Sequence, residues 1–257
     1  MKRILFCLFA FTLFTACTDD EEEAQEKVEQ KVSYHYTFEG NCNDVSSSRK
    51  DGFCTDGTTY VPGVTPNTQA LRFNRTKDSK LIIPSPIIDS KEMSISFWVK
   101  NLSDGHIFHM TSRINEKEPM FTLMMINGHL KFVITRYNNW YVYNDIKPFS
   151  HPSLDDNEWH HIVILSDFEK TAFSTITNHL YVDGKHVDSL TEGANHFSEN
   201  GYGESSYLTG VKFIMGGTLE MGHDIYKGNN MIIDNFRVYQ DYTLQDIEIK
   251  SLYRNKK

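Results

Sequence analysis

The residues best suited to bind a ligand form an aromatic, amide-rich run near the middle of the chain. The run comprises Tyr137, Asn138, Asn139, Trp140, Tyr141 and Tyr143. Sugar rings present C–H patches that pack on aromatic faces, and ligand sites generally combine an apolar floor with a few placed polar groups. We therefore predict carbohydrate binding here, with Asn138-Asn139 as a turn that leaves Trp140 near its tip. Cross-strand aromatic pairing within a sheet is the alternative.

The acidic residues favour a non-catalytic protein. Retaining glycosidases need two carboxyl groups about 5 to 5.5 Å apart, and alternate residues of a strand share one face. Neither Glu-x-Asp-x-Glu nor Glu-x-Asp-x-x-Glu occurs in the chain. The nearest groups, Asp155-Asp156-x-Glu158 and Asp224, are expected in turns as solvated carboxylates. Acids that converge from different strands would make the alternative, a glycoside hydrolase.

The eleven histidines do not predict a zinc site, because a catalytic zinc requires three converging ligands. Successive side chains alternate across a strand. His160 and His161 are therefore expected to face opposite sides of a sheet, and so are His106 and His109, which are three residues apart.

The first residues resemble the leader of a bacterial lipoprotein. Lys2 and Arg3 precede an apolar run, Ile4 to Phe14, which is too short for a membrane-spanning helix of about 20 residues. Residues 1–16 are thus predicted to be a signal peptide. The sequence Leu13-Phe14-Thr15-Ala16-Cys17 resembles the lipobox, in which the Cys is lipidated and becomes the new N-terminus. An ordinary signal peptide with an incidental Cys is the alternative.

Residues 17–32 contain seven acidic residues and two lysines. This composition predicts an acidic, disordered tether ahead of a folded domain over residues 33–257. An acidic cluster behind a lipidated Cys also resembles the export signal of Bacteroidota surface lipoproteins. The resemblance implies an outer-membrane protein, exposed at the cell surface and held by its lipid anchor only, with other surface lipoproteins as possible neighbours.

Two cysteines of the expected domain, Cys42 and Cys54, form an even pair in an oxidising compartment. We predict a disulfide between them. A closed loop of about 13 residues would contribute roughly 3 kcal/mol by constraining the unfolded chain.

The charge balance argues against a nucleic-acid partner. The chain has 26 basic and 34 acidic residues, for a net charge of -8, whereas a nucleic-acid surface needs a basic stripe to neutralise phosphates.

From residue 33 onward, short apolar runs alternate with turn residues, which is typical of an all-β sandwich. Asn127-Gly128 and Asp183-Gly184 supply the positive φ angles of type I′ turns and predict two hairpins. The expected strands are 34–38, 81–83, 93–100, 107–111, 121–126, 130–137, 159–165, 180–182, 211–215 and 231–239.

One helix is expected, over Thr243 to Tyr253, with Thr243 as its cap and Asp246 completing an approximate capping box. Residues 40–69 and 191–209 are expected to be long loops, and such loops often bind ligands. Tyr202 and Tyr207 make the second loop a secondary candidate.

An ordered set of short blocks resembles the laminin G-like, concanavalin A-like lectin/glucanase domain. The blocks are Tyr36-Thr37-Phe38-Glu39-Gly40, 43–46, 68–73, 93–99, Glu158-Trp159-His160-His161-Ile162-Val163, Leu180-Tyr181-Val182-Asp183-Gly184-Lys185 and 232–239, and Glu248 to Tyr253 closes the set. The resemblance implies a concanavalin A-like jelly-roll sandwich of two antiparallel sheets. Its members include glycan-binding modules, adhesive domains and glycoside hydrolases, so the fold alone does not choose the function.

The resemblance also implies one structural calcium ion, with Asp44 and Asp234 at positions where relatives commonly carry acids. The alternative is a turn cap for Asp44 and a buried hydrogen bond for Asp234. Asn235 departs from the second Asp of many relatives. The function expected from the sequence is non-catalytic glycan capture by a surface lipoprotein, with a protein-binding adhesion or assembly module as the alternative.

Overall fold

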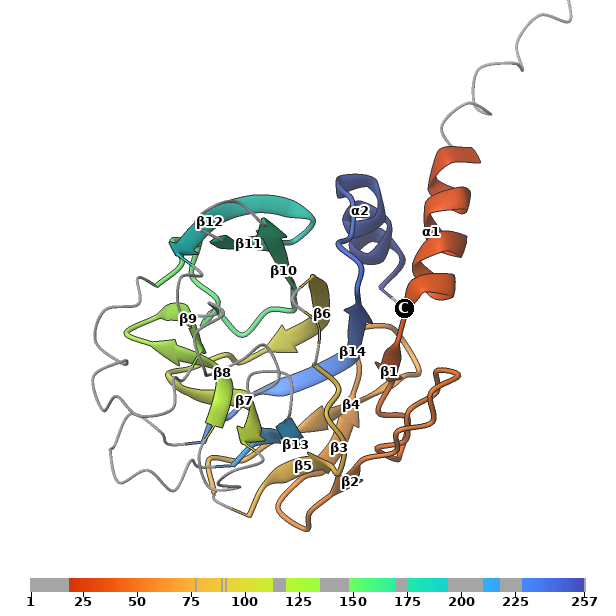
Figure 1. Cartoon of the computed structure of the whole chain (residues 1–257). Helices are drawn as coiled ribbons and strands as arrows, with labels where there is room; N and C mark the ends of the chain where they lie inside the picture. Colours follow the sequence, from red (N-terminus) through yellow and green to blue (C-terminus); the bar gives the residue numbers. More distant parts are fainter. Residues whose placement is uncertain are drawn as a thin grey trace, which may run out of the picture.

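Two antiparallel sheets packed face to face make up the computed structural model (Figure 1), which describes residues 19–76, 78–88, 90, 92–112, 119–134, 148–169, 175–193, 210–217 and 228–256. The sequence prediction of an all-β jelly-roll sandwich with a short C-terminal helix is confirmed.

Sheet A has the strand order β12-β11-β10-β6-β14-β4-β3, and β1 also pairs with β14. Its strands are β1 (Tyr34–Tyr36), β3 (Thr59–Pro62), β4 (Gln69–Arg72), β6 (Met93–Lys100), β10 (His160–Glu169), β11 (Thr175–Val182), β12 (Lys185–Gly193) and β14 (Ile232–Gln240).

Sheet B has the order β2-β5-β13-β7-β8-β9. Its strands are β2 (Phe53–Cys54), β5 (Lys80–Ile83), β7 (Gly105–Ser112), β8 (Pro119–Ile126), β9 (His129–Ile134) and β13 (Gly210–Gly216).

The main core lies between the two sheets. Phe97, Phe108, Phe213 and Phe236 meet there, with ring centroids 5.2 to 6.1 Å apart. Aromatic side chains bury a large apolar area each, so this cluster contributes much of the hydrophobic stabilisation of the sandwich.

The continuous apolar run Ile162 to Leu165 on β10 is buried on both faces of sheet A. Ile162 and Ile164 belong to the inter-sheet core, whereas Val163 and Leu165 pack into a second apolar cluster under the helices. A strand covered on both sides has no wet face, which explains the absence of alternation.

Both predicted hairpin turns are confirmed. Asn127 and Gly128 have φ of 52° and 74°, and Asp183 and Gly184 have 52° and 73°. Each pair supplies the two left-handed residues of a type I′ turn.

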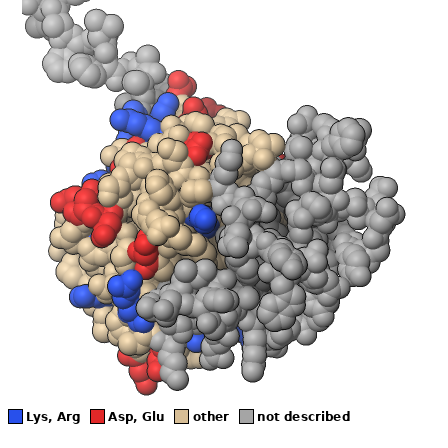
Figure 2. Space-filling view, turned by 90° about the vertical axis from the view of Figure 1, so that its left-hand side faces the viewer, with Lys and Arg blue, Asp and Glu red and all other residues tan. Residues whose placement is uncertain are grey.

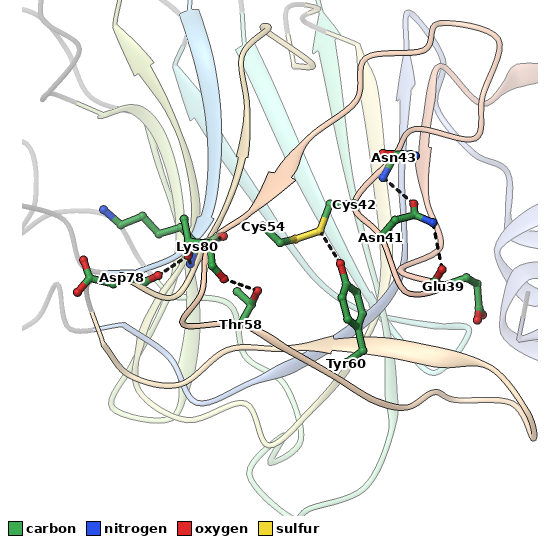
Figure 3. Close-up of a disulfide and its surroundings, with 10 residues drawn as sticks. Glu39, Asn41, Cys42, Asn43, Cys54, Thr58, Tyr60, Asp78 and Lys80 are labelled. Carbon is green, nitrogen blue, oxygen red and sulfur yellow. Dashed lines mark hydrogen bonds between the residues drawn. A yellow bond between two sulfur atoms is a disulfide. The ribbon is translucent and has the colours of Figure 1, made fainter.

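The stretch 40–69 is less irregular than predicted, because it contains β2, β3 and the first residue of β4. Its lack of long apolar runs hid these short edge strands. The predicted disulfide between Cys42 and Cys54 is present, with the two Cα atoms 6.1 Å apart (Figure 3). The Tyr60 hydroxyl lies 3.3 Å from the Cys42 sulfur and packs the bridge against β3.

The C-terminal helix α2 spans Asp246–Asn255, so it begins three residues later and ends two residues later than predicted. Thr243 is not its cap. The Glu248 carboxylate instead accepts a hydrogen bond from the Gln245 backbone N–H at 2.7 Å, so the capping box is shifted along the chain. Leu244, Ile249 and Leu252 dock on the outer face of sheet A.

The predicted disorder of the acidic tether is wrong for residues 19–31, which form helix α1 (Asp19–Lys31). Ala24 and Val28 are buried, and Val28 joins the apolar cluster beneath α2. Composition alone missed this helix because its order comes from docking on the domain rather than from its own hydrophobicity. Neither α1 nor α2 is long and apolar enough to cross a bilayer, and the described residues contain no other helix.

Candidate ligand-binding site

A hollow of about 360 Å³ opens among four loops of the sandwich. It lies where β6 leads into β7, where β8 turns into β9, after β4, and ahead of β10. Its lining residues are Arg75, Leu102, Ser103, Asp104, Met125, Gly128, Ser153, Leu154 and Asp155.

Asp104 fixes two sides of this hollow. Its carboxylate accepts hydrogen bonds from the backbone N–H groups of Asn127 and Gly128, at 2.9 and 2.8 Å, and thereby holds the β8–β9 turn. Its backbone carbonyl accepts a hydrogen bond from Nη2 of Arg75 at 3.0 Å, while Nε of Arg75 donates to the Gly228 carbonyl at 3.4 Å. The guanidinium is therefore held over the hollow by neutral acceptors and keeps its charge available for a ligand.

A buried amide supports the same loop from behind. Asn229 is 1% exposed, and its Oδ1 accepts a hydrogen bond from the Ser103 N–H at 3.2 Å. Its Nδ2 donates to the Ser103 carbonyl. With both backbone groups of Ser103 bound, the β6–β7 loop is preorganised, which lowers the entropy lost when a ligand binds.

The floor and the rim of the hollow differ in chemistry. Leu102, Met125 and Leu154 are buried and form an apolar floor. The side chains of Arg75, Ser153 and Asp155 are polar, and these three residues are exposed at the rim. An apolar floor with convergent donors and acceptors suits a small, neutral polyhydroxylated ligand.

The surface around the sandwich carries no dominant charge in the view of Figure 2. Lys and Arg side chains alternate there with Asp and Glu over the described part of this face. The described part of this face therefore produces no broad electrostatic field of one sign.

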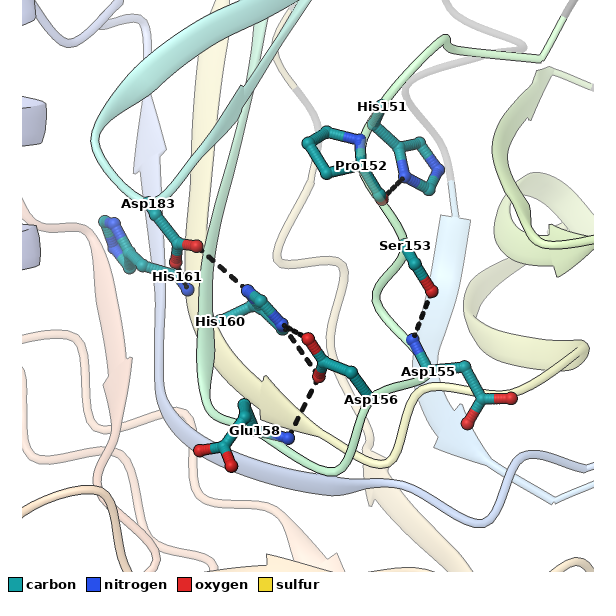
Figure 4. Close-up of polar contacts among 9 residues, drawn as sticks. All are labelled: His151, Pro152, Ser153, Asp155, Asp156, Glu158, His160, His161 and Asp183. Atoms are coloured by element: carbon teal, nitrogen blue, oxygen red, sulfur yellow. Dashed lines mark hydrogen bonds and ion pairs between the residues drawn. The ribbon is translucent and has the colours of Figure 1, made fainter.

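The loop that supplies Ser153 and Asp155 is pinned to the sheet by His160 (Figure 4). His160 lies between two carboxylates, with Nδ1 2.9 Å from Asp183 and Nε2 3.0 Å from Asp156. The Asp156 carboxylate also accepts the Glu158 N–H at 3.0 Å. Burial alone would lower the pKa of His160, but the hydrogen bonds and the charges of Asp183 and Asp156 outweigh it, so this pKa lies above its usual value.

The exposed acids of this loop occupy turn positions, as the sequence predicted. Asp155, Asp156 and Glu158 are all exposed, and the Asp156 carboxylate is engaged by His160.

His160 and His161 face different surroundings, as predicted. The His161 ring is buried against Trp98 and Tyr253, with centroids 5.0 and 6.2 Å away. Its Nε2 lies 2.9 Å from the Ser96 hydroxyl. Burial lowers its pKa to about 3, so it is a neutral framework residue.

His106 and His109 do not face oppositely, which corrects the sequence prediction. A β-bulge between His106 and Phe108 shifts the register of β7 against β8, and the two imidazoles meet with Nδ1 of His109 2.8 Å from Nε2 of His106. The extra residue of a bulge reverses the alternation. Burial lowers the pKa of both rings, that of His106 to about 4. Among the described residues, no cluster of three His, Cys, Asp or Glu side chains could hold a metal.

Asp44 serves as a turn carboxylate. Its Oδ1 accepts the N–H groups of His35 and Ser46 at 3.0 and 2.9 Å, and its Oδ2 accepts that of Lys50 at 2.9 Å. Backbone donors thus occupy both oxygens, which favours the turn-capping alternative for this residue.

Asp234 is different, because one of its oxygens has no such donor. Oδ2 accepts the Val64 N–H at 2.9 Å, whereas Oδ1 is buried without a hydrogen-bond partner among the described residues. Burial raises the pKa of Asp234 to about 6, and the nearby Glu39 carboxylate adds to this rise. A buried, unpartnered carboxylate oxygen beside a second acid fits the oxygen ligands that Ca²⁺ takes.

The other predicted site residues lie outside the described part of the chain. These are the run from Tyr137 to Tyr143, the loop tyrosines Tyr202 and Tyr207, and the lipidation candidate Cys17. The hollow was missed from the sequence, because its residues come from four separate loops and include no motif. Its only sequence signal was the Asn127-Gly128 turn.

The two antiparallel sheets, packed face to face, define a jelly-roll sandwich protein. A family model described as the concanavalin A-like lectin/glucanases superfamily matches residues 75–250. The chain belongs to this superfamily. No curated protein sequence matches it significantly.

Several solved structures share the fold. The binding domain of Paraclostridial Mosquitocidal Protein 1 has a TM-score of 0.60 at 17% identity, over 89% of this chain and 53% of that one. Domain 4 of AbnA, a GH43 extracellular arabinanase from Geobacillus stearothermophilus, was solved with arabinotriose. It has a TM-score of 0.59 at 17% identity, over 87% of this chain and 98% of that one. The binding domain of Botulinum Neurotoxin DC in complex with SialylT has a TM-score of 0.59 at 14% identity, over 90% of this chain and 52% of that one. The chain thus spans about half of the toxin binding domains and nearly all of the arabinanase domain.

Proposed function

We propose that this protein is a non-catalytic carbohydrate-binding module and that the hollow beside the β8–β9 turn is part of its binding site. The proposal rests on three features of the hollow together: loops that hydrogen bonds of Asp104 and Arg75 hold in place, an apolar floor and a polar rim. Each sugar ring offers an apolar C–H patch for such a floor and hydroxyl groups for Arg75, Ser153 and Asp155.

Two relatives in fold support this ligand class. The arabinanase domain was solved with arabinotriose, and a neurotoxin binding domain with SialylT. At identities of 14 to 17%, these likenesses establish the fold, and the ligand class of this chain is part of the proposal.

We further propose that the module is a surface lipoprotein. Residues 1–16 would be removed as a signal peptide and Cys17 acylated, which would hold the domain at the outer membrane through its acyl chains alone. Glycan capture beside other surface lipoproteins is the role that this placement favours. One structural calcium ion is also part of the proposal, with the unpartnered Oδ1 of Asp234 as one of its oxygen ligands.

A glycan array with the purified full chain tests the ligand class. The proposal expects binding to a defined set of glycans, with no reducing ends released from the same polysaccharides. Binding that is lost in Trp140→Ala would extend the site to the aromatic run, whereas unchanged binding would remove Trp140 from it. Release of reducing ends would make the protein a glycoside hydrolase. A co-purifying protein partner without any glycan signal would make it an adhesion or assembly module.

A further inference from the structure

Helix α1 lies directly behind the expected lipid anchor and is bound to the folded domain. A 13-residue helix is marginal by itself in water, and Ala24 and Val28 are its only apolar residues. Its order must therefore come from tertiary contacts, and these contacts are specific.

Val28 provides the apolar part of the docking. Its side chain is fully buried in the cluster formed by Val163, Leu165, Tyr239, Leu244, Ile249 and Leu252. The remaining members come from β10, β14 and α2 and the segment before it, so α1 seals an apolar seam between the second helix and sheet A.

Two ion pairs fix the position of α1 along this seam. Lys27 lies 3.1 Å from the Glu248 carboxylate, which is 1% exposed. Glu29 lies 3.3 Å from the Arg237 guanidinium, which is 3% exposed. In each pair the α1 side chain is partly exposed, 41% for Lys27 and 45% for Glu29, so water weakens the attraction. Both pairs form only when α1 sits at this position along the seam, so sliding of α1 by one turn would break both.

Gln25 adds a third fixed point on α2. Its side-chain oxygen accepts hydrogen bonds from the Ser251 hydroxyl at 3.0 Å and from Asn255 Nδ2 at 2.7 Å. Together with the ion pairs, these bonds hold α1 against α2 at several points along their lengths, which sets the angle of α1 as well as its position.

We propose that α1 is a docked spacer that holds the sandwich on the membrane in one orientation, with α1 and α2 toward the lipid and the hollow directed away from it. Only Thr18 separates Cys17 from α1 in the sequence, and two residue steps span at most about 7 Å. Figure 1 shows α1 at the upper right and β8 and β9, whose turn lines the hollow, on the opposite side. This inference rests on the lipid anchor of the proposed function. The interaction surface is the side of the domain that carries α1 and α2, and its partner is the bilayer.

Two measurements on the mature, lipidated chain test the proposal. The first is amide hydrogen exchange of residues 19–31, compared between the wild-type chain, Val28→Asp, and Gln30→Asp, which adds the same charge at an exposed position. Docking predicts protected amides in the wild type and in Gln30→Asp, and protection at least about tenfold lower in Val28→Asp. Amides that exchange as fast as in a free peptide would overturn the docking.

The second measurement uses phosphatidylcholine vesicles with a headgroup quencher and a fluorophore on Lys250→Cys or on Ser153→Cys, both exposed positions. We expect strong quenching at position 250, little at 153, and loss of the difference when Val28→Asp is added. Equal quenching at the two positions with α1 protected would refute the orientation. A chain that does not join vesicles at all would refute the anchor of the proposed function and the orientation with it, whereas α1 protection would still report the docking.

Discussion

His160 should stabilise the domain in a pH-dependent manner. Protonated, it donates one hydrogen bond to Asp183 and one to Asp156, at 2.9 and 3.0 Å. A neutral imidazole has a single N–H, so deprotonation loses one charge-assisted bond and leaves a ring nitrogen facing a carboxylate. Because the Asp156 side chain is 44% exposed, water weakens this bond, and we expect a loss of about 1 kcal/mol.

The direction follows from the raised pKa of His160 in the folded state. The extra stability is fully present below the pKa of an unfolded histidine, about 6.5, and is lost as the pH rises through the higher folded-state pKa. The buried rings of His35, His106, His109 and His161 act in the opposite direction, because their lowered pKa values destabilise the fold in acid.

The assay must therefore compare two proteins at each pH. We predict that the free energy of unfolding, measured in urea, is higher for the wild type than for His160→Gln. The difference between the two proteins should be about 1 kcal/mol larger near pH 5.5 than near pH 8.5. His186→Gln is the control, because that exposed ring bonds the Ser189 hydroxyl rather than a carboxylate. A difference between wild type and His160→Gln that does not change with pH would show that protonation of His160 does not stabilise the fold.

Three further predictions concern the disulfide, the β8–β9 turn and the proposed calcium ion. Cys42→Ser should lower the free energy of unfolding by roughly 3 kcal/mol in denaturant titrations, and an unchanged midpoint would mean that the Cys42–Cys54 bridge does not constrain the chain. Asp104→Ala should weaken glycan binding by about tenfold in calorimetry by freeing two N–H groups of the β8–β9 turn; equal affinity would show that this turn does not shape the site. A chelator should lower the melting temperature of the wild type but not of Asp234→Ala, and a wild-type melt that does not move would remove calcium from Asp234.

Local sequence signals predicted the elements that are defined by local physics. The turns at Asn127-Gly128 and Asp183-Gly184 need only residues that tolerate positive φ, and the strand Met93 to Lys100 needs only a short run rich in β-branched and aromatic residues. The structure has all three. The disulfide was predictable because the expected domain has two cysteines and an exported protein folds in an oxidising compartment, and the Cys42–Cys54 bridge is present.

The features that sequence missed depend on partners distant along the chain. Helix α1 is ordered by β10, β14 and α2 rather than by its own composition. His106 and His109 meet because of a bulge whose register is set by β8. The hollow is assembled from four loops, and its frame residue Asp104 contacts a turn more than twenty positions away. No short window of sequence contains these relationships.

Calorimetry with one glycan that the wild-type chain binds tests most directly whether the hollow is the glycan site. We predict that Arg75→Ala weakens binding by about 10- to 100-fold, because a hydrogen bond to a charged group contributes about 1.5 to 3 kcal/mol. Arg72→Ala, at an exposed arginine of β4 that does not line the hollow, should bind like the wild type. Equal affinities for all three proteins would show that the glycan binds away from the hollow.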